Sequence, residues 1–383
     1  MSKTETSSPS SRTQWSTQTI LLLFFFVPVS LALLVYQLDS FDPAPLPIPP
    51  KSTHPSLTAQ LKNDHVLSGS KFVGSGKLVG PEDIVYDGVA GVMYTTCFDG
   101  WVKRVTVNDS AADSVVEDWV HTGGRPLGVA LGQQGDVIVA DAYKGLLRIS
   151  SEGEIELLTD EAEGVKFKLT DGVDIARDGT IYFTDASYKY NFRDHIWDVL
   201  EGRPHGRLMS FDPVTRTTRV LVRDLYFANG VAVSPDQNYV VFCESVLARC
   251  KKYYIDGEKK GTTEKFVENL YGAPDNIHYD GHGHYLIAYS SEITFLWDVV
   301  LRYPVVRKIL AIVTKHTGAL HGLRNAGVLV VDLEGKLVAH YYDPALTLIS
   351  SGAIIGDHLY MGSIGYSYIV RLDLSKHPAT PVA

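Results

Sequence analysis

The sequence has little cysteine and no excess of basic residues, and each shortage excludes a class of protein. Only 3 of its 383 residues are cysteine, too few for a disulfide framework. Cys243 and Cys250 flank a predicted strand connection, where they could pair in an oxidising compartment or stay as buried thiols. The formal net charge of -9 leaves no basic footprint, so we do not expect nucleic acid as a partner.

Several catalytic signatures are also missing. The sequence has no Gly-x-Ser-x-Gly nucleophile elbow, no phosphate-binding loop and no dinucleotide fingerprint. A Ser-His-Asp hydrolase is therefore disfavoured. His278, His282 and His284 lie close together, but they fit neither a zinc spacing nor the partner of a nucleophile. We interpret them as solvated turn residues.

The longest apolar run lies near the N-terminus, and no charged residue occurs between Arg12 and Asp39. A spanning helix needs about 20 apolar residues. We predict a signal-anchor helix over residues 20–37 after a cytosolic tail over 1–19, because basic residues precede the run and acidic ones follow it. The alternative is a cleaved signal peptide, since Ser30-Leu31-Ala32 resembles a cleavage site.

Both topologies send the remainder of the chain into the secretory lumen. We expect a single-pass type II protein of the endoplasmic reticulum or vacuole, or a soluble lumenal protein if the signal is cleaved. Residues 38–60 are predicted to form a proline-rich, extended stem, and residues 61–383 the folded domain. Asn108 begins the one N-glycosylation sequon, in a polar turn.

A β-hairpin pattern recurs six times in the folded domain: a leading residue, a short apolar strand, a turn and a second apolar strand. The copies begin at Glu82, Leu127, Asp171, Asn229, Asp275 and Ser351. Three of the intervals are 44 to 46 residues long, and the other two are 58 and 76. A period near 45 is typical of four-stranded propeller blades. The sequence therefore predicts an all-β fold, a six-bladed β-propeller; a two-sheet sandwich is the alternative, but it would not explain the period.

The two long intervals contain predicted helical insertions. Residues 190–203 show a helix-like pattern, and residues 295–313 are predicted to form a helix pair broken at Pro304. The sixth blade reaches the end of the chain without an outer strand. We expect residues 65–73 to supply that strand and close the ring.

The first strand of each propeller blade lines the central channel, so the leading residue of each copy should face the axis. Four of these residues are oxygen donors: Glu82, Asp171, Asn229 and Asp275. Carboxylates brought together repel unless they are protonated or bridged by a cation. Oxygen-only ligands suit Ca²⁺ best and Mg²⁺ second. Taken singly, such residues commonly cap turns.

The second strand of each blade returns to the same face. Its last residues are predicted to wall an acidic, partly aromatic pocket for a small organic substrate. With Ser351, the predicted pocket residues are Phe98, Asp141, Tyr143, Asp185, Tyr188 and Glu244.

At these residues the chain resembles the plant strictosidine synthase-like family, whose animal relatives are the adipocyte plasma membrane-associated proteins. The resemblance covers roughly residues 60 to 375. Its specific motifs are Gly80-Pro81-Glu82-Asp83, Arg125-Pro126-Leu127-Gly128, the stretch 200–208, the stretch 228–236 and Pro274-Asp275-Asn276-Ile277.

The resemblance implies a six-bladed propeller. The wider superfamily includes paraoxonase-type lactonases, gluconolactonases and a calcium-dependent phosphotriesterase, which hold a catalytic Ca²⁺ on the channel axis. Glu82, Asp171, Asn229 and Asp275 fall where those ligands lie. The phosphotriesterase relative also implies Asp275 as the nucleophile, and a water activated by the metal is an equal alternative.

Two departures limit what carries over. The glutamate that strictosidine synthase uses for its Pictet–Spengler condensation is replaced by Ser350 or Ser351, and neither can replace a carboxylate in proton transfer. The paraoxonase-type histidine is replaced by Leu127. We therefore expect a Ca²⁺-dependent hydrolase of small esters or lactones. The alternatives are an amine–aldehyde condensing enzyme acting through Asp185 or Glu244, and a non-catalytic scaffold. The expected partners are a small-molecule substrate and, through the N-terminal helix, a membrane.

Overall fold

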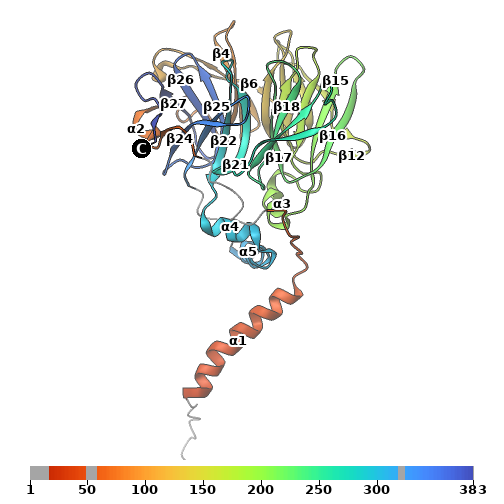
Figure 1. The fold of residues 1–383 in the computed structure, drawn as a ribbon, viewed down its shortest axis with the longest axis vertical. Helices are drawn as coiled ribbons and strands as arrows, with labels where there is room; N and C mark the ends of the chain where they lie inside the picture. Colours follow the sequence, from red (N-terminus) through yellow and green to blue (C-terminus); the bar gives the residue numbers. More distant parts are fainter. Residues whose placement is uncertain (1–16, 49–57, 318–323, 383) are drawn as a thin grey trace, which may run out of the picture.

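The structure is a computed structural model that describes residues 17–48, 58–317 and 324–382, and side chains from residue 24 onward. The predicted tail therefore lies largely outside the described residues, as do residues 49–57 of the predicted stem. The described chain forms a six-bladed β-propeller with a few helices at one end (Figure 1). The prediction of the fold class is confirmed in this respect.

The first three blades each contain four antiparallel strands in chain order. Blade 1 contains β3 (Pro81–Asp87), β4 (Val92–Cys97), β5 (Trp101–Thr106) and β6 (Val116–His121). Blade 2 contains β7 (Pro126–Leu131), β8 (Val137–Asp141), β9 (Gly145–Ile149) and β10 (Ile155–Thr159). Blade 3 contains β13 (Thr170–Ile175), β14 (Ile181–Asp185), β15 (Gly206–Asp212) and β16 (Thr217–Leu225). A short hairpin between blades 2 and 3 contains β11 (Glu161–Ala162) and β12 (Val165–Lys166).

The last three blades continue the pattern, and the fifth is extended by both ends of the domain. Blade 4 contains β17 (Ala228–Val233), β18 (Tyr239–Glu244), β19 (Arg249–Tyr254) and β20 (Thr263–Val267). Blade 5 contains β21 (Gly272–Tyr279), β22 (His284–Glu292), β23 (Ala326–Asp332), β24 (Leu337–Asp343), β1 (Leu61–Asn63) and β28 (Thr380–Pro381). Blade 6 contains β25 (Ile349–Ile355), β26 (His358–Ser363), β27 (Ile369–Asp373) and β2 (Ser70–Val73).

The core lies between the faces of neighbouring blades. Every residue of β17 and β18 is buried, because both faces of these strands are covered by adjacent blades. Apolar side chains of one blade interleave with those of the next, as Val173 and Phe183 of blade 3 do with Ile138 and Ala140 of blade 2. A blade cannot bury its own two faces, so its stability depends on its neighbours.

The ring closes between the first and the last segments of the domain. Strand β2 pairs antiparallel with β27 from Ser70 opposite Leu372 to Val73 opposite Ile369. The prediction that residues 65–73 supply the missing outer strand is confirmed for residues 70–73, whereas residues 66–69 form helix α2. The inner strand β25 of blade 6 also contacts β3 of blade 1, so each inner strand has an inner strand on either side.

The predicted helical insertions are present at the end of the propeller where the inner strands begin (Figure 1). The first holds the short helix η3 (Phe192–Asp194) and α3 (His195–Glu201). The second holds α4 (Phe295–Arg302) and α5 (Pro304–Thr317), separated at Tyr303 as predicted from Pro304. Elsewhere, helix α2 (Val66–Gly69) precedes β2, and η2 (Ala111–Asp113) lies between β5 and β6.

Helix α1 (Thr17–Leu38) projects from the same end of the propeller as α4 and α5 (Figure 1). Within the described part of the chain, no helix combines the length and apolarity needed to cross a membrane. The signal anchor over residues 20–37 stays a prediction, and the side chains of residues 20–23 lie outside those described.

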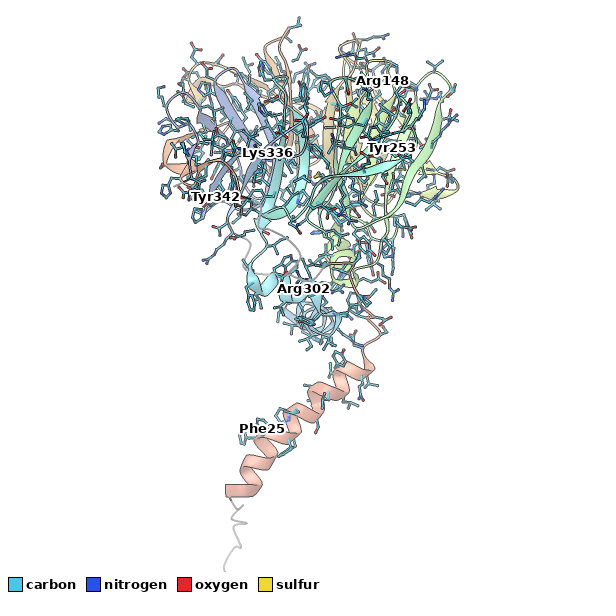
Figure 2. All side chains as sticks on the ribbon, in the orientation of Figure 1. Phe25, Arg148, Tyr253, Arg302, Lys336 and Tyr342 are labelled. Atoms are coloured by element: carbon cyan, nitrogen blue, oxygen red, sulfur yellow. A yellow bond between two sulfur atoms is a disulfide. The ribbon has the colours of Figure 1, made fainter. Side chains whose placement is uncertain are left out.

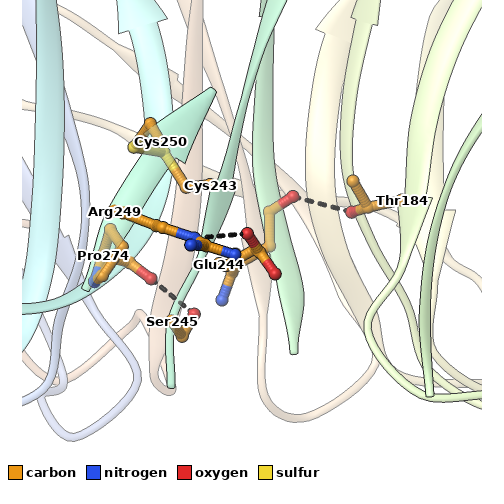
Figure 3. The surroundings of a disulfide bond; sticks show 8 residues. Thr184, Cys243, Glu244, Ser245, Arg249, Cys250 and Pro274 are labelled. Carbon is orange, nitrogen blue, oxygen red and sulfur yellow. Dashed lines mark hydrogen bonds and ion pairs between the residues drawn. A yellow bond between two sulfur atoms is a disulfide. The ribbon is translucent and has the colours of Figure 1, made fainter. Parts of the chain in front are cut away.

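A disulfide joins Cys243 of β18 to Cys250 of β19, so these two residues are paired rather than free (Figure 3). They lie directly opposite each other in the antiparallel register. Cys97 is a buried free thiol. Disulfides of this kind are typical of proteins in oxidising compartments.

Closure of the ring through β2 predicts how substitutions in this strand change the free energy of unfolding. The side chain of Val73 is buried beside Leu78 and Ile369, whereas Lys71 of the same strand is exposed. We expect Val73→Asp to lower the free energy of unfolding by about 3 to 5 kcal/mol, because it buries an unpaired charge. Lys71→Asp is the matched control, and we expect it to change stability by less than about 0.5 kcal/mol. Denaturant unfolding of both variants measures the difference; equal effects would contradict closure through β2.

Candidate metal centre in the central channel

Three carboxylates from alternate blades meet on the channel axis. Glu82 lies on β3, Asp171 on β13 and Asp275 on β21. One oxygen of each lies within 4.8 Å of the others. Glu82 and Asp171 are buried, and Asp275 is half-buried. The structure thus brings together three of the four residues that the repeat placed around one axis.

The fourth residue, Asn229 of β17, completes the group. Its side chain hydrogen bonds with Asp275. Within the described chain, however, Asn229 Oδ1 and Asp171 Oδ1 are buried without a hydrogen-bond partner. Unpaired buried oxygens are costly in a low-dielectric interior, so these two atoms fit an additional ligand. We name Glu82, Asp171, Asn229 and Asp275 the axial cluster.

The sequence places a glycine directly after two members of the axial cluster, and packing explains this choice. A Cβ added to Gly172 would lie 2.7 Å from the carbonyl oxygen of Asn229 in the next blade. A Cβ added to Gly230 would lie 2.5 Å from the carbonyl oxygen of Asp275. Only glycine allows the inner strands to approach this closely.

Polar side chains also link three of the inner strands to a neighbouring blade at the level of the cluster. Thr184 Oγ1 donates to the Asn229 carbonyl at 2.7 Å, and Ser245 Oγ donates to the Pro274 carbonyl at 2.6 Å. Ser350 Oγ donates to the Glu82 carbonyl at 2.8 Å. Because these bonds hold the backbone of cluster residues, they fix where the side-chain oxygens converge.

Arg125 is the one cation in direct contact with the axial cluster among the ion pairs of the described residues. Its Nη2 lies 2.5 Å from Glu82 Oε2, and both side chains are buried. The guanidinium carbon lies 5.0 Å from the ring centre of Phe98 and 4.9 Å from that of Phe192. Two aromatic rings therefore hold Arg125 against Glu82 at the channel mouth.

The carboxylates of the cluster are difficult to ionise together. Burial raises the pKa of Glu82 to about 7, although the charge of Arg125 opposes this shift. Burial and the nearby charges of Glu82 and Asp275 raise the pKa of Asp171 well above its ordinary value. Burial and the charge of Glu82 do the same to Asp275. These shifts are typical of carboxylates buried close together, and a bound cation would favour their charged forms.

The residues present fit a divalent cation. Three carboxylates against one guanidinium leave two negative charges, and a single divalent ion would neutralise both. All four donors are oxygens from carboxylates or an amide, the ligand type that Ca²⁺ and Mg²⁺ take. The two unpaired oxygens of Asp171 and Asn229 would then gain a ligand.

A second polar layer lies beside the axial cluster, and the sequence analysis did not identify it. His278 Nε2 lies 2.6 Å from Asp83 Oδ1, and Ser351 Oγ donates to the same oxygen at 2.7 Å. Burial lowers the pKa of His278, but the carboxylate of Asp83 outweighs it and the net shift is upward. Asp174 accepts from the backbone of Ile175 and Val233 at 2.8 and 2.7 Å. The sequence contains a signal for this layer, because Asp174 and His278 are polar residues at equivalent positions of two otherwise apolar inner strands.

The interpretation of His278 as a solvated turn residue is therefore wrong. It lies on β21 and joins blade 5 to blade 1 through Asp83. His282 does lie in the turn after β21, whereas His284 begins β22 and pairs with Asp280 at 3.1 Å.

The predicted pocket residues fall into two groups. Phe98, Tyr143 and Tyr188 are exposed at the ends of second strands, as expected for the walls of a channel mouth. Asp141, Asp185 and Glu244 are fully buried instead. The expectation that these three acids face an open pocket is corrected by this burial.

The three buried acids accept hydrogen bonds from the backbone of their own blades. Asp141 accepts from the backbone of Arg125 at 3.0 Å, and Asp185 accepts from that of Leu169 at 3.0 Å. Glu244 accepts from that of Tyr226 at 3.0 Å. Each of these acids thus caps the segment that enters the inner strand of its own blade. Asp185 also forms an ion pair with Arg207 at 2.6 Å. Glu244 forms one with Arg249 at 2.7 Å (Figure 3). Neither acid is available for the proton transfers of a condensing enzyme.

The strand register of blade 6 shows whether Ser350 or Ser351 occupies the position that Glu82 has in blade 1. Ile349 lies opposite Ser363 as Pro81 lies opposite Cys97, so Ser350 takes the place of Glu82. Ser351 is buried against Asp83 and does not line the mouth, which corrects its assignment to the pocket.

Two family models match this chain. The one described as strictosidine synthase matches residues 171–258, and the one described as strictosidine synthase-like, N-terminal, matches residues 62–105. Strictosidine synthase-like 4 of Arabidopsis thaliana is 55% identical over 360 residues, which cover 93% of this chain and 96% of that protein. The human adipocyte plasma membrane-associated protein is 32% identical over 380 residues, covering 93% and 89%.

Solved structures share the fold at low identity. A gluconolactonase from Xanthomonas campestris superposes with a TM-score of 0.58 at 15% identity, covering 84% of this chain and 97% of that one. A calcium-binding regucalcin from Agrobacterium tumefaciens gives 0.57 at 13% identity, covering 85% and 98%.

The close approach of the inner strands predicts the effect of a single methyl group. We expect Gly172→Ala to lower the free energy of unfolding by about 1 to 3 kcal/mol, because its Cβ would overlap blade 4. Gly88→Ala is the control, since its Cβ would have an ordinary 3.7 Å contact with Tyr86. Denaturant unfolding measures both; a Gly172→Ala protein as stable as the Gly88→Ala control would contradict this account of the axis.

The raised pKa of Glu82 predicts how the stability of the metal-free protein depends on pH. Between about pH 4.5 and pH 7, the folded protein keeps the Glu82 proton while the unfolded chain loses it. The stability contributed by this group is complete below that range and is lost as the pH rises. We expect the melting temperature in chelator to fall across this range, and Glu82→Gln to make the fall shallower. An unchanged slope in Glu82→Gln would show that Glu82 titrates normally.

Proposed function

The chain belongs to the strictosidine synthase-like family, and we propose that it is a Ca²⁺-dependent hydrolase of small esters or lactones. The axial cluster supports this proposal, because it gathers three carboxylates and leaves two buried oxygens without a partner. The structural neighbours that share its propeller include a gluconolactonase and a calcium-binding regucalcin. Lactone hydrolysis and calcium are properties of those proteins, and here they are part of the proposal.

In the proposed site, Glu82, Asp171, Asn229 and Asp275 hold the ion. A bound Ca²⁺ supplies a Lewis acid that polarises the carbonyl of an ester or lactone. Asp275 is the most exposed carboxylate of the cluster, so we assign it the role of nucleophile toward a substrate entering from the mouth. Arg125 positions Glu82, and the exposed aromatic rings of Phe98, Tyr143 and Tyr188 contact the organic part of the substrate.

The replacement of a carboxylate by Ser350 argues against true strictosidine synthesis. Ser350 is buried and donates its hydroxyl proton to the Glu82 carbonyl. A hydroxyl engaged in this way cannot exchange protons with an amine or aldehyde. The other acids considered for a condensation, Asp185 and Glu244, are held in buried ion pairs.

We also propose that the protein is attached to a membrane by α1, with the propeller in an oxidising, secretory compartment. The apolar surface of α1 and the Cys243–Cys250 disulfide support this placement. The animal relatives are named as plasma membrane-associated. Glycosylation of Asn108 is part of the same proposal; its side chain now donates to the Asp113 carbonyl at 2.7 Å.

Calcium removal and one substitution test the hydrolase. We expect Ca²⁺ to raise the melting temperature of the full-length protein and to support hydrolysis of aryl esters or lactones, and chelation to abolish both effects. Asp275→Asn should lower turnover by at least about 100-fold, because it removes a charge that contacts the reacting group. Asp178→Asn, in the turn before β14, is the matched control and should retain turnover.

The outcomes separate the candidate functions. Calcium stabilisation without hydrolysis of any ester or lactone would favour a scaffold that uses the ion only for stability. If calcium changed neither the melting temperature nor turnover, the metal centre itself would be refuted.

A further inference from the structure

Helix α5 carries three exposed apolar side chains on its outward face. Val305, Ile309 and Val313 are spaced four residues apart, so they lie on one face of the helix. With Leu296 of α4 and Tyr303 between the helices, they form a surface that we name the basal apolar face. These five side chains are between 47% and 70% exposed.

The opposite face of α5 is built around a buried charge. Arg307 is 0% exposed, and its guanidinium donates to the carbonyl oxygens of Leu200 in α3 and Ala44 in the stem. Burial lowers the pKa of Arg307 to about 10. Ala311 on the same face is also buried. Val306 and Leu310 also pack inward, so α5 is apolar on both faces, whereas a helix on the surface of a water-soluble domain has a polar outward face.

Helix α1 lies against α5 and continues the basal apolar face. Lys308 Nζ lies 4.7 Å from the ring centre of Tyr36, and Lys315 Nζ lies 2.7 Å from Asp39 Oδ2. These contacts fix the end of α1 beside the outward face of α5. Figure 2 shows Phe25 on the projecting α1 and Arg302 on α4 at the same end of the molecule.

The positions of the exposed apolar side chains on α1 indicate which kind of partner covers this helix. Phe24, Phe25, Phe26 and Val27 follow one another and are 54% to 80% exposed. With 3.6 residues per turn, four successive residues point in every direction around the helix. A second copy or another protein would cover one side of α1, whereas lipid covers all sides and can reach the basal apolar face as well. Tyrosine and lysine at the junction are residue types that favour the boundary between lipid and water.

We propose that the basal apolar face lies on the surface of a lipid bilayer, with α5 parallel to the membrane plane. This placement turns the channel mouth toward the bilayer, because α3, α4 and α5 surround the end of the propeller where the inner strands begin (Figure 1). The inference rests on the proposed membrane attachment through α1 and is independent of the proposed hydrolysis.

A depth measurement on the full-length protein tests this proposal. Ile309→Cys labelled with an environment-sensitive fluorophore is reconstituted in phosphatidylcholine vesicles that contain brominated phosphatidylcholine. The new thiol is the reactive one, since Cys97 is buried and Cys243 is paired with Cys250. Val89→Cys is the control, because Val89 is fully exposed in the turn after β3, at the far end of the propeller.

We expect brominated lipid to quench the label at residue 309 at least twofold and to leave the label at residue 89 unchanged. Equal quenching at the two positions, or none at residue 309, would overturn the proposal. Protection of residue 309, together with thiol cross-linking between two unlabelled Ile309→Cys copies, would show that a second copy covers the face, which would also overturn it. Quenching needs neither calcium nor turnover, so its result is distinct from failure of the hydrolase.

Discussion

The close approach of six inner strands around one axis is the constraint on which the rest of the structure depends. Glycine follows Asp171 and Asn229, and a methyl group at Gly172 or Gly230 would lie within 2.7 Å of a carbonyl oxygen in the next blade. Because the strands approach this closely, a side chain placed at the start of one strand meets those of strands more than 40 residues away. The same approach buries the carboxylates close to other acids. Burial is the main cause that raises the pKa values of Glu82, Asp171 and Asp275, and the charges of neighbouring carboxylates add to it. The packing of the inner strands thus gathers negative charge that a bound cation would neutralise.

Arg125 neutralises part of the negative charge of the axial cluster and leaves the rest. One guanidinium balances one of the three carboxylates, and its position between Phe98 and Phe192 keeps it on Glu82. A second arginine in this place would leave one negative charge instead of two and would weaken the affinity for a divalent ion. In the neighbouring layer, His278 and Asp83 already balance each other. Asp174 of that layer accepts two backbone N–H groups. The unpaired oxygens of Asp171 and Asn229 lie in the axial cluster instead.

The sequence predicted the fold and the axial cluster because both follow from one repeated pattern. The leading residue, the apolar strand and the turn recur at a nearly constant period, so the alignment of Glu82 with Asp171 and Asp275 follows from the repeat itself. Side-chain direction at irregular positions could not be obtained in this way. The irregular register at the start of β25 decides between Ser350 and Ser351, and Asp141, Asp185 and Glu244 turn back to cap their own blades. A repeated acid at the end of a strand looks the same in sequence whether it caps the backbone or faces a pocket.

The buried face of helix α5 is a second feature that the sequence pattern could not predict. The helix also links the basal apolar face to the mouth of the channel. Its residues are apolar on more than one face, so periodicity alone could not show which face is buried; the buried contacts of Arg307 decide this. Arg307 holds α5 to α3 and the stem, and α3 continues from the segment that carries Phe192 against Arg125. A continuous set of contacts therefore runs from the basal apolar face through Arg307 and α3 to Glu82. The elements that would meet the membrane are thus the ones that hold the mouth of the channel, and the orientation of the propeller and the geometry of its charged site depend on the same contacts.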